Sequence, residues 1–527
     1  MKLPRIFSLA GDAARDLAKR GIERKLGGYR RTVHHEDGSL PERPEGAAPQ
    51  VAVVGGGIAG LSAASTLASR GVAVTLYERA SYLGGKAGAW TVEVDGRPFR
   101  VDHGFHAFFR HYYNLQGMLD RLGITAHLRP IDDYVILRRD RTRISFAGTD
   151  TVPLLNLLSL SKTGLYRVSE LLFSERMHRL DPFLRYDEEK TFAAWDHVNY
   201  DDFAREADLP SDLRLVFNTF SRAFFSEGDR LSVASLVRAF HFYYLSNDAG
   251  LLYDYLDDDY ETAFATPARQ WLDANGVTVR LDTPVRALER LEDGAWSVDG
   301  QRFDAVVLAC DVNAARAIVA DSPTLAASHP DFAAQMGRQR SSQRYAILRL
   351  WLDCDVGGDL PVFVITDRLR ALDAVTFTHR VVPDARAWAS SRGGGVYELH
   401  CYAVPDALAD DTAVRDALVQ EFEHYFSAAR GARVVGEYLH VRADFAAFHV
   451  GLHADRARVD TGVAGLWLAG DWVRLPHPAT LMEAACMAGA LAANGILRAH
   501  GLREAPVYAV PAKGILADVP APPRLRR

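Results

Sequence analysis

The sequence predicts an α/β fold, in which a domain built on a helix-covered parallel sheet with a β-meander carries an inserted mixed α+β domain. Three observations predict it. A complete strand–turn–helix–strand unit lies between Val51 and Glu78, short apolar strands suited to the same sheet recur within residues 296–311 and 465–471, and helical and strand-rich segments separate them. With 527 residues the chain is too long for one hydrophobic core, so we expect at least two domains.

The first strand runs into a glycine-rich turn. Val51–Val54 is a short apolar run suited to a buried parallel strand. The turn matches G-x-G-x-x-G at Gly55, Gly57 and Gly60. The first glycine permits a tight turn, the second lets the backbone approach a pyrophosphate, and the third lets helix and strand pack closely. The helix that begins at Ile58 and Ala59 offers unpaired N–H groups and a positive dipole end to phosphates.

The second strand of this unit ends on Glu78, about 20 positions after the first glycine. An acid at this position accepts hydrogen bonds from ribose hydroxyls and disfavours a 2′-phosphate, and Arg79 follows it at the same edge of the sheet. Strand, glycines, helix, second strand and acid in this order predict a Rossmann-type dinucleotide-binding unit.

A second glycine-rich stretch follows at Leu83–Gly88. It resembles the G-G-R/K segment of the flavoprotein superfamily that contains amine oxidases, protoporphyrinogen oxidases and carotene desaturases. The resemblance implies FAD as the cofactor, with Gly84, Gly85 and the basic residue along its phosphates and flavin edge. Most members carry arginine there, whereas this chain has Lys86, which keeps the charge but loses the bidentate fork.

The C-terminal part supplies the other half of the predicted cofactor site. An apolar strand ends on Gly470 and Asp471, and in this superfamily such a carboxylate faces the ribityl and pyrophosphate region. A helix with a small-residue face then begins at Leu481 and Met482 beneath the flavin, and its dipole favours an anionic reduced flavin. Glu483 and Thr480 have the spacing of a capping box, so we favour a capping role for Glu483 over a catalytic one.

The predicted domains are discontinuous. Short strands between residues 276 and 311 resemble the segment that re-enters the FAD domain in this superfamily, and this places the backbone of Val285 against adenine. The nucleotide domain then comprises residues 50–120, 270–312 and 455–500. The substrate domain comprises a largely helical part at 121–269 and an antiparallel sheet at 313–454. A basic segment and linker, 1–49, and a tail, 501–527, flank them.

The stretch Val101–Leu115 indicates the branch of the superfamily. It reads VDHGFHAFFRHYYNL and resembles the carotene desaturases, most of all the β-carotene desaturase/methyltransferase group that includes isorenieratene synthase. The similarity runs from Val51 to Leu497. Its aromatic residues provide apolar surface for a polyene and can stabilise a developing carbocation; they are Phe105, Phe108, Phe109, Tyr112 and Tyr113.

His103 and His106 are separated by two residues, and we expect them to share one face of a strand. In the functional interpretation, one histidine contacts the flavin edge and the other transfers a proton. In the structural interpretation, both are hydrogen-bonded to nearby backbone. The resemblance implies hydride abstraction from a β-ionone ring, intramolecular methyl migration and aromatisation. The alternatives are a desaturase of acyclic carotenes, an amine-oxidase-like enzyme on a non-carotenoid substrate, and a non-catalytic flavin-binding protein. The sequence indicates no particular electron acceptor.

Composition bounds the partners and the compartment. A formal charge of −6 and a pI near 6.3 argue against a nucleic-acid-binding protein. Four separated cysteines without a C-x-x-C indicate a reducing compartment and no metal site. We find no transmembrane or signal-peptide pattern, and expect a cytoplasmic protein.

Residues 1–31 carry nine basic and three acidic side chains in an otherwise acidic chain. We expect this segment and a leucine-rich helix at 154–172 to rest on the inner face of the membrane around an apolar opening. A basic helix that is only solvated, or that packs on its own domain, is the alternative.

Overall fold

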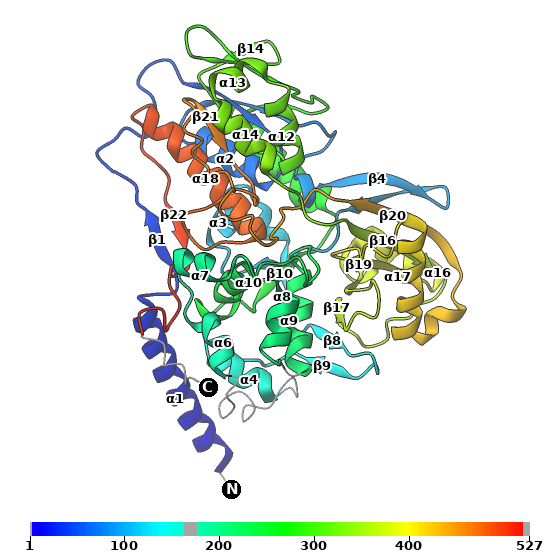
Figure 1. Cartoon of the computed structure of the whole chain (residues 1–527). Helices are drawn as coiled ribbons and strands as arrows, with labels where there is room; N and C mark the ends of the chain where they lie inside the picture. The colour runs from blue at the N-terminus through cyan, green and yellow to red at the C-terminus, as the bar shows by residue number, and fades with distance from the viewer. Residues whose placement is uncertain (1–2, 163–176, 210, 520–527) are drawn as a thin grey trace.

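The computed structural model describes residues 3–162, 177–209 and 211–519. The chain forms an upper region with a parallel sheet and a lower region with a larger mixed sheet and a group of helices (Figure 1). The parallel sheet has five strands in the order β11-β3-β2-β15-β21. They are β2 (Gln50–Val54), β3 (Ala73–Tyr77), β11 (Thr278–Arg280), β15 (Ala305–Leu308) and β21 (Leu466–Leu468).

Two helices with small residues pack closely against this sheet and each other. They are α2 (Ile58–Ser69) and α18 (Leu481–Ala499). A Cβ added at Gly489 would lie 2.2 Å from the carbonyl oxygen of Ala59, so the two backbones touch. The Ser62 hydroxyl donates a hydrogen bond of 2.7 Å to the Cys486 carbonyl across the same contact. The close packing draws the N-termini of both helices to the carboxyl edge of the sheet, where ligands of open α/β sheets bind.

A three-stranded antiparallel meander and three helices extend the upper region. The strands are β12 (Leu288–Arg290), β13 (Trp296–Val298) and β14 (Gln301–Phe303), and the helices are α12 (Val312–Ala320), α13 (Pro323–Ser328) and α14 (Pro330–Arg338). The predicted α/β class, with its meander and inserted mixed domain, is confirmed. The residue boundaries predicted for the domains stay a prediction.

The lower region is organised by a seven-stranded sheet in the order β20-β16-β19-β18-β17-β8-β9. The strands are β8 (Val135–Leu137), β9 (Arg143–Ser145), β16 (Tyr345–Leu352), β17 (Phe363–Thr366), β18 (Ala374–Phe377), β19 (Gly395–Cys401) and β20 (Val434–Arg442). Neighbours are antiparallel except β17 and β8. β8 and β9 come from residues 121–269, where the sequence pattern is largely helical. Every residue of β16 and β19 is buried. They are covered by α16 (Pro383–Arg392), by α17 (Asp411–Tyr425) and by the hairpin of β4 (Ala89–Val94) and β5 (Arg97–Asp102).

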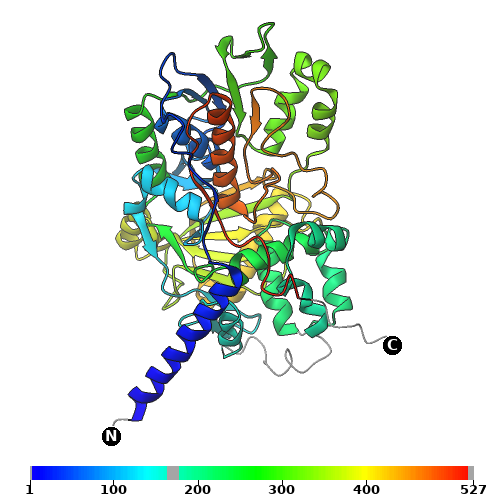
Figure 2. The ribbon, with the colours of Figure 1, turned by 90° about the vertical axis from the view of Figure 1, so that its left-hand side faces the viewer.

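Short helices lie beside this sheet, and a long N-terminal helix leaves the body of the molecule (Figures 1 and 2). These short helices are α4 (Leu155–Lys162), α6 (Met177–Leu184), α7 (Glu188–Trp195), α8 (Tyr200–Glu206), α9 (Ser211–Arg222) and α10 (Val233–Phe240). Two further helices belong to the upper region: α3 (Tyr113–Arg121) packs against α18, and α11 (Thr266–Ala274) packs against α2 and β11. The N-terminal helix is α1 (Leu3–Leu26). The predicted linker, residues 32–49, begins within a strand, because β1 (Arg31–His34) pairs with β22 (Val507–Ala509). The remaining strands are β6 (Phe108–Phe109), β7 (Leu128–Pro130) and β10 (Tyr253–Leu256).

Candidate functional site

The glycine-rich turn between β2 and α2 tolerates no side chain at two of its positions. Gly55 has a φ of +114°, and a Cβ there would lie 2.6 Å from the Ala309 carbonyl oxygen. A Cβ on Gly60 would lie 1.8 Å from the carbonyl oxygen of Gly55. The turn therefore folds back onto the first turn of α2 and leaves the N-terminus of that helix open at the edge of the sheet.

Glu78 at the end of β3 holds this turn in place. One carboxylate oxygen accepts a 2.7 Å hydrogen bond from the Gly56 N–H, and the other accepts one of 2.8 Å from the Ala80 N–H. The carboxylate thus fixes the glycine turn as well as facing the space above the sheet. This backbone role is a function of Glu78 that the sequence pattern alone does not reveal.

A cavity of about 960 Å³ begins at this turn and continues into the lower region. It gathers sixteen of the predicted site residues from seven separate segments of the chain. The lining includes Gly55, Gly57, Ile58, Ala59, Glu78, Arg79, Gly84, Gly85, Lys86, His103, His106, Val285, Gly470, Asp471, Leu481 and Met482. Gly60 and Glu483 do not line it, since Gly60 packs inside the turn and Glu483 faces another helix.

The upper part of the cavity has the chemistry that a dinucleotide needs. Gly57 and Gly84 form a backbone bridge, and a Cβ on Gly85 would come within 3.0 Å of the Gly57 Cα, so bare backbone faces the cavity. Burial raises the pKa of Asp471, while the charge of Lys86 opposes that rise. The Lys86 ammonium also lies 4.8 Å from the centre of the Phe445 ring. Backbone N–H groups, the cation of Lys86 and the partly buried Asp471 fit pyrophosphate and ribityl groups.

The loop between β5 and β6 carries both predicted histidines. The expectation that they share a strand face is wrong, because residues three apart point to opposite faces of a strand. In addition, residues 103–107 form a loop, in which Gly104 has a φ of +107°. His103 Nδ1 lies 3.0 Å from the Tyr345 hydroxyl. His106 Nδ1 lies 2.7 Å from the Gly104 carbonyl oxygen and 3.2 Å from the Tyr260 hydroxyl. Burial lowers the pKa of His103 well below its usual value and lowers that of His106 to about 4, so both imidazoles are neutral near pH 7.

The lower part of the cavity is lined mainly by aromatic side chains. Phe105 stacks on Phe363 with ring centres 4.7 Å apart, and Phe109 meets Tyr243 edge-on at 4.9 Å. Of the predicted aromatic residues, Phe105, Phe109 and Tyr112 line the cavity, whereas Phe108 and Tyr113 do not. The sequence reasoning missed further aromatic lining residues, namely Tyr134, Phe146, Phe220, Phe224, Phe225, Tyr243, Tyr244, Tyr253, Tyr345, Phe363, Tyr402 and Phe445. The run HFYYL at 241–245 is the signal that could have found some of them.

Comparison with known proteins identifies the family. Flavin-containing amine oxidoreductases match residues 58–497. The chain belongs to this family. FAD is accordingly its cofactor, and it is an FAD-dependent oxidoreductase, as the glycine and Gly-Asp patterns predict.

Among characterised relatives of this flavoenzyme, a carotenoid phi-ring synthase of Streptomyces griseus is 37% identical over 482 residues, which cover 89% of this chain and 92% of the relative. A carotenoid phi-ring synthase of Chlorobaculum tepidum is 28% identical and covers 88% and 91%. A zeta-carotene desaturase of Synechocystis is 42% identical over only 80 residues, 15% of this chain and 16% of that protein. A putrescine oxidase structure superimposes with a TM-score of 0.61 at 16% identity, covers 86% of this chain and 100% of that chain, and shows the shared fold.

Glu483 does not have the predicted capping role in this flavoenzyme. Thr480 is the N-cap residue of α18, but its hydroxyl donates to Tyr243 at 3.0 Å and accepts no bond from the helix. The Glu483 carboxylate instead accepts hydrogen bonds from the backbone N–H groups of Asn114 and Leu115, at 3.0 and 2.9 Å, and from the Asn114 side chain. It therefore stabilises the N-terminus of α3. Its catalytic role has no geometric support, because it lies outside the cavity.

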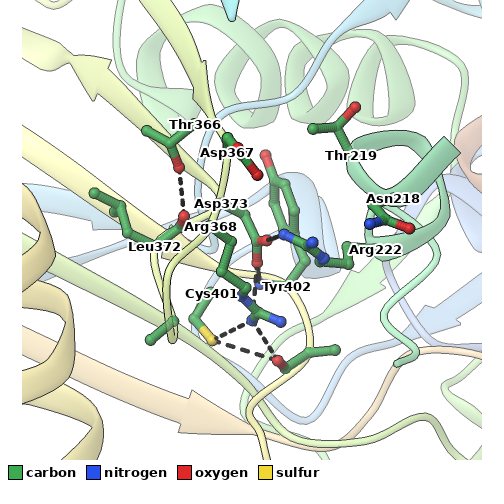
Figure 3. Close-up of polar contacts among 12 residues, drawn as sticks. Asn218, Thr219, Arg222, Thr366, Asp367, Arg368, Leu372, Asp373, Cys401 and Tyr402 are labelled. Atoms are coloured by element: carbon green, nitrogen blue, oxygen red, sulfur yellow. Dashed lines mark hydrogen bonds and ion pairs between the residues drawn. The ribbon is translucent and has the colours of Figure 1, made fainter. Parts of the chain in front are cut away.

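A buried polar cluster closes the aromatic end of the cavity (Figure 3). Asp373, which lines the cavity, lies between Arg222 of α9 and Arg368, with N–O distances of 3.1 Å to each. The Tyr402 backbone N–H donates a further 2.8 Å bond to Asp373, and Arg368 contacts the Cys401 sulfur at 3.0 Å. The only acid of this cluster that faces the cavity is thus fully engaged by protein groups within the described part of the chain.

Proposed function

We propose that this flavoenzyme desaturates the β-ionone ring of a carotenoid and moves a methyl group within the ring, so that an aromatic end group forms. The observation that carries the proposal is the 37% identity to a carotenoid phi-ring synthase across nearly the whole of both chains. The aromatic lower part of the cavity supports it, because stacked and edge-on rings give an apolar polyene a complementary surface.

The chemistry divides between the cofactor and the chain. FAD, when bound, is the hydride acceptor. Each desaturation removes one hydride and one proton from the ring, and aromatisation of a cyclohexene ring needs two such steps. Because one hydride is transferred at a time, an external electron acceptor must reoxidise FAD between the two steps. The migrating methyl group carries its electron pair from one ring carbon to the next. The aromatic walls exclude water and stabilise the positive charge that develops on the ring.

His106 is the proposed acceptor of the proton. The Gly104 carbonyl can only accept a hydrogen bond, so Nδ1 of His106 carries hydrogen and Nε2 carries the lone pair. His106→Ala and His106→Gln should retain FAD and stop product formation or divert it to partly desaturated rings. Normal rates of aromatisation by both variants would make His106 structural.

Pigment analysis tests the substrate class. The chain should be expressed in hosts that accumulate β-carotene, γ-carotene or lycopene, and the products separated by chromatography with their absorption spectra. We expect aromatic end groups from β-carotene and γ-carotene, and none from lycopene, which has no ring. Further desaturation of lycopene alone would replace this proposal by a desaturase of acyclic carotenes.

An amine substrate is the second candidate, since the putrescine oxidase fold is shared. An ammonium group that enters an apolar cavity needs an opposing negative charge. Asp373 at the aromatic end is already paired with Arg222 and Arg368. Bleaching of the bound flavin by a panel of primary and secondary amines, with no bleaching by carotenes, would favour this alternative.

We also propose that the protein is cytoplasmic and rests on the inner face of the membrane through α1 and the neighbouring surface. Arg15 and Lys19 join α1 to Asp150 and Asp248. The segment that follows Asp248 runs from the cavity wall at Leu251 to the surface at Leu252. Three leucines of the described chain are exposed here. Leu17 of α1 is 69% exposed, Leu158 of α4 is 44% exposed, and Leu252, which follows the cavity wall, is 37% exposed. No helix among the described residues is long and apolar enough to span a bilayer.

Charge reversal on α1 tests this location without removing buried residues. Arg20, Arg24 and Lys25 are exposed, and their joint replacement by glutamate should weaken sedimentation with anionic vesicles in low salt. Deletion of residues 1–31 should have the same effect, but it also removes buried Leu26 and Tyr29. Residues 163–172 of the predicted leucine-rich helix lie outside the described residues. Unchanged sedimentation of the charge-reversed protein would remove α1 from the proposal.

A further inference from the structure

The loop that carries His106 is held by three successive backbone N–H groups. The Gly104 N–H donates to Asp102 at 2.8 Å, the Phe105 N–H donates to Glu398 at 2.9 Å, and the His106 N–H donates to the Tyr260 hydroxyl at 3.0 Å. The three acceptors come from β5, from β19 and from the segment before α11. Each peptide plane of the loop is therefore fixed from a different side.

This arrangement aims one carbonyl at the imidazole. The peptide that donates through the Phe105 N–H is the same peptide whose carbonyl oxygen belongs to Gly104. That oxygen lies 2.7 Å from His106 Nδ1. A hydrogen bond from the peptide N–H to Glu398 thus sets the direction of the carbonyl that binds His106. Gly104 must also be glycine, since an added Cβ would lie 2.9 Å from Ile347 Cδ1 at a φ of +107°.

Arg349 holds the two carboxylates that anchor the loop. Its guanidinium donates to the Arg100 carbonyl at 2.9 Å, to Asp102 at 3.0 Å and to Glu398. Arg349 is 4% exposed and Glu398 is 1% exposed. Burial would raise the pKa of Glu398, but the charge of Arg349 and the hydrogen bond to His400 outweigh it and lower that pKa. Glu398 is therefore an ionised acceptor inside the protein.

We propose that Glu398, oriented by Arg349, is a positioning residue that fixes the Nδ1–H tautomer of His106 and so leaves Nε2 as the proton acceptor in the cavity. The inference rests on the proposed function for the identity of the proton donor, a carotenoid ring. A histidine ligand or base commonly depends on such an outer partner for its tautomer. Here the outer partner acts through one peptide group rather than on the ring itself.

The chain offers a matched control in Glu421. This buried carboxylate of α17 also accepts backbone N–H groups, those of Arg370, Ala371 and Leu372, but does so in a loop away from His106. Glu398→Gln and Glu421→Gln each replace a buried acceptor oxygen by an amide donor. Both variants lose a buried hydrogen-bond acceptor, and Glu398→Gln also loses its ion pair with Arg349. The difference that reports positioning is therefore the His106 tautomer in folded, FAD-loaded protein.

The test measures the tautomer of His106 and the rate of flavin reduction. The full-length FAD-loaded variants, labelled with ¹⁵N-histidine, are compared by NMR, with the His106 signal identified by its loss in His106→Gln. Anaerobic reduction of the bound flavin by β-carotene in vesicles gives the single-turnover rate. We expect Glu398→Gln to bind FAD normally, to populate the Nε2–H tautomer of His106 and to slow flavin reduction and aromatisation at least tenfold. Glu421→Gln should keep the tautomer and stay within twofold of the wild-type rate.

Two results would overturn the inference. One is an unchanged His106 tautomer in Glu398→Gln, whatever its rate, and the other is an equal loss in Glu421→Gln. If Glu398→Gln does not fold, Arg349→Lys is measured in its place, because lysine keeps the charge but loses the planar fork of donors that orients Glu398. If wild-type protein does not act on β-carotene, the proposed function fails, and the NMR comparison still decides the tautomer.

Discussion

Glu483 provides a quantitative test of the structure, because its carboxyl group is 1% exposed and burial raises its pKa to about 7. The ordinary value is 4.5. The shift of about 2.5 units corresponds to about 3.4 kcal/mol, at ~1.36 kcal/mol per unit. The folded state prefers the protonated form of Glu483, so the shift contributes to the free energy of unfolding at low pH. This stabilisation is fully present below about pH 4.5 and is lost as pH rises through 7.

The perturbation is Glu483→Gln, which replaces the titrating group by a neutral one of the same shape. At pH 5 the folded Glu483 is itself protonated and, like glutamine, carries hydrogen on one side of its terminal group, so the two proteins should differ little in stability there. Of the ~3.4 kcal/mol, about 0.8 is already lost at pH 5. The stability gap should therefore shift by ~2.5 kcal/mol in favour of the variant between pH 5 and pH 8.

The assay is urea unfolding of both proteins at pH 5, 6, 7 and 8, followed by tryptophan fluorescence and by flavin release. Other titrating groups are common to both proteins and cancel in the difference between them. A gap that stays constant to within about 0.5 kcal/mol over this range would refute the reasoning, because Glu483 would then titrate alike in the folded and unfolded chain.

Three further substitutions have expected outcomes. Gly60→Ala should lower FAD affinity at least tenfold, because the added Cβ would lie 1.8 Å from a backbone carbonyl, whereas Gly337→Ala, in an open helical position, should not; flavin content per protein measures both. Asp471→Ala should lower flavin occupancy more than it lowers the circular dichroism signal, and equal losses would make the aspartate structural. Asp373→Asn leaves two buried arginines underpaired and should lower the stability by about 3–5 kcal/mol. Asp406→Asn at an exposed ion pair should change the melting temperature little.

The cofactor half of the site could be predicted because its determinants are local. Gly55, Gly57 and Gly60 stand at a fixed spacing, since one turn of chain must reverse and begin a helix within six residues. Glu78 follows β3 directly and Asp471 comes three residues after β21, two strands of the same parallel sheet whose carboxyl ends meet at one edge. A sequence pattern therefore predicts these residues, because the constraint on each of them comes from its neighbours along the chain.

The substrate half could not be predicted in the same way, because its contacts join distant segments. Tyr260 and Glu398 bind the loop of His106 from 154 and 293 positions away. The sequence contains no spacing pattern that predicts these long-range hydrogen-bond partners. The Thr480–Glu483 spacing failed for a related reason: α3 packs beside α18, so the carboxylate satisfies the N-terminus of the neighbouring helix and leaves its own without a side-chain cap.

The two histidines show how this difference bears on chemistry. In the sequence His103 and His106 are equivalent candidates, but the left-handed turn at Gly104 gives them different surroundings. His103 is enclosed edge-on by Trp90 and His440, at 5.0 and 5.2 Å between ring centres. His106 has its Nδ1 committed to a carbonyl that a buried carboxylate orients, which leaves the other nitrogen for the cavity. A base that must accept a proton in a dry site has to be neutral beforehand and aimed by its second nitrogen, and His106 meets both conditions.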